Sequence, residues 1–118
     1  MVEQAVLNVI NGRPENFTKI IESILEPYDF TAEEYIEDNG SVTLSLNEMD
    51  LVENGKDKQE ALINMGRGIL EYADDFYNDF DSWAKGYRKA HIPYLLKALI
   101  INDAAKIGGL VQCHPGEN

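Results

Sequence analysis

The sequence predicts an α+β fold, in which a small antiparallel or mixed sheet is followed by a long helix and C-terminal helices. Two patterns carry this prediction. Val42, Leu44 and Leu46 alternate with hydroxyl side chains, as in a strand with one buried face. Apolar residues between Leu62 and Phe80 recur at spacings of three and four, as in an amphipathic helix. The expected order is strand, helix, strand, strand, helix and helix, with helices covering one face of the sheet.

The N-terminal part begins with a predicted strand and helix. An apolar stretch at residues 5–10 is rich in Val, Leu and Ile, which favours a strand. Pro14 suits the first turn of a helix, and the apolar residues from Phe17 to Leu25 have helical spacing. Pro27 ends this helix, because the residue before a proline is disfavoured in helical conformation.

A hairpin is expected next. Residues 30–38 form the second predicted strand, and Asn39-Gly40 favours the tight turn into the strand at residues 42–46. The alternation then stops, and Asn54-Gly55 predicts a further turn.

The long helix is predicted from about Asp57 to Trp83. Asp57 and Glu60 have the spacing of a capping box, which places the helix start. Gly66 and Gly68 each lower helix stability by about 1 kcal/mol relative to alanine, unless the helix approaches a neighbour closely there. The residues predicted to form its buried stripe are Leu62, Met65, Ile69, Tyr72, Ala73, Phe76 and Phe80.

The chain is predicted to end in one more helix and a tail. Pro93 suits the first turn of that helix, with Lys97 exposed, and Gly108-Gly109 and Pro115 predict a fraying tail. With no linker composition in sight, we expect one domain, residues 1–118. Its parts are a strand, helix and hairpin part (1–56) and a helical extension (57–118).

The composition limits the classes of function that the chain can have. With 118 residues and 44% hydrophobic side chains, the chain can bury a core without disulfides or a structural metal. The single cysteine favours a cytoplasmic location, and no apolar run reaches the roughly 20 residues of a membrane span. A net charge of −11 argues against a protein whose main role is to bind the phosphate backbone of nucleic acid, and it favours a basic partner.

We expect no enzyme activity, cofactor or metal site. Cys113 and His114 are adjacent, which is poor spacing for metal ligands, and the serines lie in no nucleophile elbow. Gly66-Arg67-Gly68 lies inside the predicted helix and follows no strand, so it does not predict a dinucleotide site. A set of acid, base and nucleophile cannot be assembled from the sequence.

The residues between 72 and 87 form the candidate binding surface. Tyr77, Trp83 and Tyr87 fall off the buried stripe, and Trp, Tyr and Arg are the types that anchor protein interfaces. Acidic residues flank these aromatics on the helix, and a basic turn follows them. The predicted partner-binding residues are Glu71, Asp74, Asp75, Tyr77, Asp79, Trp83, Tyr87 and Arg88.

Several segments carry a family resemblance. Asn39-Gly40 and the following residues 42–51 resemble the hairpin of Phd/YefM-type antitoxins, and the strand and helix expected before them fit that family's order. Residues 88–99 resemble the C-terminal part of a Phd-like group in anaerobic bacteria. Residues 55–62, leading to residues 71–73, are similar to the strand-to-helix step of HicB-type antitoxins.

The resemblance implies the antitoxin of a type II toxin-antitoxin system. Such a protein binds and neutralises a small basic toxin of the RelE type that is encoded nearby. It also implies a homodimer and repression of its own operon by DNA binding, although residues 1–50 contain only Arg13 and Lys19 as cations.

A different class of function is left open by the residues themselves. The alternative is a small-molecule-binding or regulatory α+β domain without a toxin partner. Its pocket would lie between sheet and helix, lined by Phe30, Leu44 and Tyr72.

Overall fold

The computed structural model describes residues 14–83 and 85–116. The strand predicted at residues 5–10 lies outside the described residues. The described elements, in chain order, are α2 (Pro14–Leu25), β1 (Thr31–Ile36), β2 (Val42–Leu46), β3 (Val52–Gly55), α3 (Lys58–Asn78), α4 (Phe80–Trp83), the 3-10 helix η1 (Tyr87–His91), α5 (Ile92–Ile101), α6 (Ala104–Leu110) and β4 (Gln112–Pro115).

The four strands form one mixed sheet in the order β3-β2-β1-β4. β2 pairs antiparallel with β1, placing Ala32 opposite Leu46, and also with β3. β4 pairs parallel with β1, placing Cys113 beside Ala32. The predicted α+β class with helices after the sheet is therefore confirmed.

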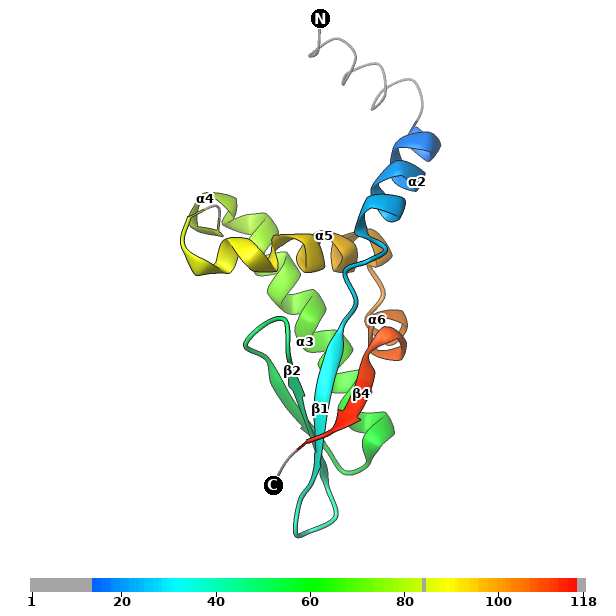
Figure 1. Ribbon diagram of the computed structural model, residues 1–118, viewed down its shortest axis with the longest axis vertical. Coiled ribbons are helices and arrows are strands. Elements are labelled where there is room, and N and C mark those ends of the chain that lie inside the picture. The colour runs from blue at the N-terminus through cyan, green and yellow to red at the C-terminus, as the bar shows by residue number, and fades with distance from the viewer. Residues whose placement is uncertain (1–13, 84, 117–118) are drawn as a thin grey trace, which may run out of the picture.

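The core lies between the sheet and α3, which covers one sheet face (Figure 1). Val42, Leu44 and Leu46 are buried as their alternation predicted, while Thr43 and Ser45 on the opposite face are half-buried. α6 and α5 pack against α3, which buries the stripe that contains Met65 and Ile69. Gly40 adopts a φ of 86°, as the tight hairpin turn requires.

The C-terminal tail differs from the prediction. Gly108-Gly109 lies within α6, and Pro115 ends β4. β4 is held by backbone pairing with β1, a strand about 80 residues earlier, and local sequence patterns do not reveal such distant pairing. Asn54-Gly55 ends β3 rather than forming a free turn. The sequence pattern does not predict β3, because this strand is four residues long and its one strongly apolar residue, Val52, is 63% exposed.

The long helix also differs from the prediction. α3 begins after Asp57, whose side chain accepts a hydrogen bond from the Glu60 backbone N–H at 2.8 Å, as predicted. It ends at Asn78 instead of continuing to Trp83, because the Asp79 backbone leaves the helical region at φ −138° and ψ 50°. The break changes the helical phase, and Phe80 turns outward, whereas Trp83, seven residues after Phe76, lies on the buried side.

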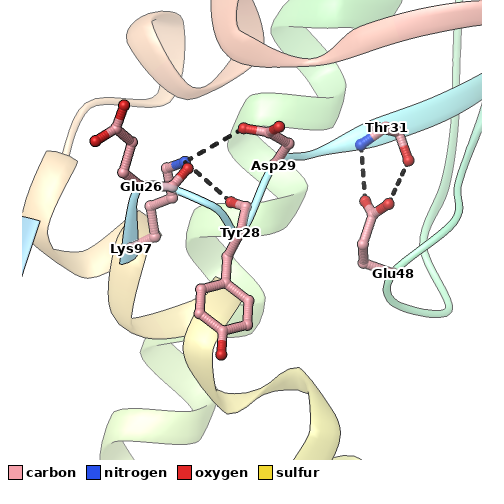
Figure 2. Close-up of polar contacts among 6 residues, drawn as sticks. All are labelled: Glu26, Tyr28, Asp29, Thr31, Glu48 and Lys97. Atoms are coloured by element: carbon pink, nitrogen blue, oxygen red, sulfur yellow. Dashed lines mark hydrogen bonds and ion pairs between the residues drawn. The ribbon is translucent and has the colours of Figure 1, made fainter. Parts of the chain in front are cut away.

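The connection from α2 to β1 is fixed by side chains from distant elements (Figure 2). Lys97 in α5 donates to the Tyr28 and Glu26 carbonyl oxygens at 2.9 and 3.3 Å, and its ammonium lies 3.8 Å from Asp29. Its side chain is 18% exposed, so the prediction of an exposed Lys97 is wrong. Glu48 accepts hydrogen bonds from the Thr31 backbone N–H and hydroxyl.

α3 and α6 touch through glycines. A Cβ atom on Gly66 would lie 2.1 Å from the Ala104 carbonyl oxygen, and one on Gly108 would lie 2.5 Å from the Leu62 carbonyl oxygen. Real Cβ atoms never approach backbone so closely, so both positions require glycine. The close approach considered for Gly66 is therefore present, and it brings α6 near enough for β4 to reach β1.

Replacing Gly108 with alanine is expected to lower the free energy of unfolding by about 1–3 kcal/mol, because the new methyl group would push the two helix backbones apart. Gly109→Ala is the matched control. A Cβ there meets nothing within 4 Å, so we expect a change between zero and a stabilisation of about 1 kcal/mol from helix propensity. Urea unfolding monitored by circular dichroism measures both, and equal stabilities of the two variants would contradict the close contact.

Candidate protein-binding surface

The eight predicted binding residues lie on the C-terminal half of α3, at its C-cap Asp79, on α4 and on η1. These elements form the corner at the left of Figure 1, beyond the ends of the strands. Tyr77 and Tyr87 are each 73% exposed, Arg88 is half-buried, and Trp83 is 3% exposed. The four predicted acids are exposed, and we call them the acidic face: Glu71, Asp74, Asp75 and Asp79.

Three members of the acidic face, Asp74, Asp75 and Asp79, lie at or next to the last turn of α3, which is the unfavourable end of the helix. The C-terminus of a helix carries partial negative charge, so each carboxylate near it destabilises an exposed helix by about 0.3–1 kcal/mol. The last turn of α3 contains no cation to offset this. Helix stability therefore does not explain these acids, whereas a cationic partner would benefit from their field.

Behind the acidic face, six aromatic and imidazole rings contact one another in series. We call this series the ring chain, and its order is Phe80, Phe76, Trp83, Tyr72, His91 and Tyr87. Neighbouring ring centroids lie 4.6 to 6.1 Å apart, within the usual range for attractive aromatic pairs. The chain joins α3, α4 and η1 into one corner.

The middle of the ring chain is buried at Phe76, Trp83 and His91 and half-buried at Tyr72. Trp83 contacts Tyr72 and Phe76 edge-on, and the Arg88 guanidinium lies 4.2 Å from the centre of the Trp83 ring. The Tyr72 hydroxyl is hydrogen-bonded to His91 Nδ1 at 3.2 Å, and burial raises the pKa of Tyr72 above its ordinary value. The expectation that Trp83 lies off the buried stripe is therefore wrong. Trp83 follows Phe76 by seven residues, which is close to two helical turns and is the spacing of the stripe itself.

The two ends of the ring chain are exposed. Tyr87 is 73% and Phe80 53% exposed, although the helical pattern had placed Phe80 in the core. The sequence does contain a sign of this change. Asn78 and Asp79 both favour caps and turns over helix interiors, because their side chains compete for backbone hydrogen bonds. Ending the helix at that pair would have removed Phe80 from the stripe.

The structure also bears on the metal, thiol and membrane-spanning features considered in the sequence. Among the described residues, no group of three or more His, Cys, Asp and Glu side chains could hold a metal ion. Cys113 is half-buried in β4 rather than being a surface thiol in a fraying tail, and burial raises its pKa. No described helix is long and apolar enough to cross a membrane.

The pocket considered for a small molecule is filled. Phe30 and Leu44 are 1% and 0% exposed and belong to the core. A hollow of about 500 Å³ lies instead between α2 and α5, where Lys19, Leu25 and Ile101 are among its lining residues.

Comparison with known proteins points to one class. A family model for the antitoxin of RelE/RelB toxin-antitoxin systems, PHD_like, matches residues 16–113. The crystal structure of a protein from Syntrophomonas wolfei subsp. wolfei, described as the antitoxin part of a proposed toxin/antitoxin system, aligns with a TM-score of 0.76 and 30% sequence identity. The alignment covers 84% of this chain and 72% of that one. A search of curated proteins finds no match.

Trp83→Ala is expected to lower the free energy of unfolding by about 3–5 kcal/mol, because it removes the buried middle of the ring chain. Tyr77→Ala, at an exposed neighbouring position, should stay within about 0.5 kcal/mol of the parent. Denaturant unfolding followed by far-ultraviolet circular dichroism reports both variants. A Trp83→Ala protein as stable as the parent would show that Trp83 is not part of the core.

Cys113 is expected to react with iodoacetamide at pH 8 more slowly than free cysteine does, because its raised pKa leaves less thiolate and β4 covers part of the sulfur. The same protein unfolded in urea is the control and should react at the free rate. Equal rates in the folded and unfolded protein would mean that β4 separates readily from β1.

Proposed function

The chain belongs to the PHD_like family of RelE/RelB antitoxins, and from this premise we propose that it binds and neutralises a small basic toxin of the RelE type encoded nearby. The observation that carries the proposal is the family match, which spans residues 16–113 of the 118. The chain acts by binding and not as an enzyme. We place it in the cytoplasm, where a lone thiol such as Cys113 stays reduced.

Charge supports a basic partner. The net charge of the chain is −11, and four of its exposed carboxylates lie together on the acidic face. A field of this kind raises the rate of encounter with a cationic protein, because it steers diffusion before contact is made. The lifetime of the complex depends instead on the apolar contacts formed after docking.

A homodimer and repression of its own operon form the second part of the proposal. This part is supported by the family resemblance. Residues 1–50 contain two cations, Arg13 and Lys19, and eleven acidic residues. This charge does not favour contacts with DNA phosphates in that part of the chain. Titration of operator DNA with the chain, alone and with toxin, tests this part separately.

Coexpression tests the first part. The small basic protein encoded beside this gene should inhibit growth when expressed alone, and the chain should relieve that inhibition and copurify with it. Coexpression that yields neither a complex nor relief would contradict the proposal.

Neutralising the acidic face is expected to lower the association rate severalfold at low salt and to change dissociation much less. The variant carries Glu71→Gln, Asp74→Asn, Asp75→Asn and Asp79→Asn. Raising salt should slow association of the parent for the same reason, because the Debye length falls from about 8 Å at physiological ionic strength to about 3 Å at 1 M. Stopped-flow mixing at several salt concentrations measures these rates.

The matched control removes four exposed acids elsewhere, by Glu22→Gln, Glu26→Gln, Glu37→Gln and Asp38→Asn. Both variants lose four negative charges, so a larger effect at the acidic face locates the partner there. An unchanged association rate for the acidic-face variant at low salt would contradict that location.

A further inference from the structure

The two exposed ends of the ring chain are held in place by its buried middle. Phe80 stacks edge-on against Phe76 with centroids 5.7 Å apart, and Tyr87 stacks edge-on against His91 at 6.0 Å. Phe76 and His91 are themselves 4% and 7% exposed. Each exposed ring therefore rests on a buried ring that is fixed by the core.

Such rings suit protein binding. An exposed aromatic side chain that is already held in one orientation loses little conformational entropy when a partner covers it. Buried aromatic anchors of this kind carry much of the binding energy of protein interfaces. Tyr77 is a useful contrast, because it is as exposed as Tyr87 but makes no ring contact with another described residue.

The charges beside the two rings differ. Asp79 and Asp81 flank Phe80 in the sequence, and both are exposed. Tyr87 lies between exposed Lys85 and Lys89. A complementary surface would therefore be cationic where it meets Phe80 and neutral or anionic where it meets Tyr87.

We propose that Phe80 and Tyr87 are the two anchors of the toxin interface, each covered by an apolar part of the toxin surface, which is cationic beside Phe80. The inference rests on the proposed function and adds to it the residues that hold the complex together. The rings determine how long the complex lasts, and the acidic face determines how quickly it forms. A second copy of this chain is a poorer occupant of this corner, because a two-fold contact here would bring two acidic faces together.

The test compares dissociation rates from the small basic protein encoded beside the gene, immobilised on a biosensor. Phe80→Ala and Tyr87→Ala should each speed dissociation by about tenfold or more, as expected of anchor residues. Tyr77→Ala should have an effect at least threefold smaller than Tyr87→Ala. Ile36→Ala, which removes a 67% exposed side chain at the far end of β1, should leave the rate unchanged.

Near-ultraviolet circular dichroism of the single tryptophan, Trp83, checks that each variant keeps its core. Unchanged dissociation of folded Phe80→Ala and Tyr87→Ala would overturn the inference while leaving the proposed function intact, because the parent complex would still form. Equal effects of Tyr77→Ala and Tyr87→Ala would overturn the role of the ring chain. If the free chain is a dimer that Phe80→Ala and Tyr87→Ala dissociate, the rings serve a second copy, and the inference is wrong. A parent chain that forms no complex would contradict the proposed function itself.

Discussion

The parallel pairing of β4 with β1 is the constraint on which the rest of the architecture depends. Two parallel strands cannot be joined by a tight turn, so the chain must leave the sheet and return before β4 can form. Here α3 leads away from β3, α5 leads back, and α6 delivers β4 to the edge of β1 (Figure 1). The glycine contact between α3 and α6 makes that return possible, because the two backbones touch without intervening side chains.

The candidate binding corner follows from the lengths of these elements. α3 has 21 residues and spans about 31 Å, whereas the six residues of β1 span about 20 Å. The sheet therefore cannot cover the last third of α3. Another surface has to bury the apolar stripe there, and Trp83 and its ring contacts take that place. The corner where the chain reverses is consequently well packed around Trp83, while Phe80 and Tyr87 remain exposed to solvent.

Local patterns in the sequence predict the elements that are determined by interactions between residues close together in the chain. The alternation of Val42, Leu44 and Leu46 and the capping residue Asp57 both predicted what the structure contains, because strand faces and helix starts depend on neighbouring residues. β4 could not be predicted in this way, since its partner strand lies far away in the sequence. Phe80 is exposed because the helical phase of α3 does not continue past Asp79. Trp83 is buried, as its seven-residue spacing from Phe76 indicates.

The cost of the acids near the end of α3 is offset by the aromatic packing around that end. Asp74, Asp75 and Asp79 lie near the negative end of α3, where an exposed carboxylate lowers helix stability. The burial of Trp83 offsets several such unfavourable charges, since a buried tryptophan contributes several kcal/mol and each exposed charge costs about one or less. The same ring chain that compensates for the acids also supports Phe80 and Tyr87 at the surface. Charge for attracting a partner and rigid rings for holding it can therefore share one corner without destabilising the fold.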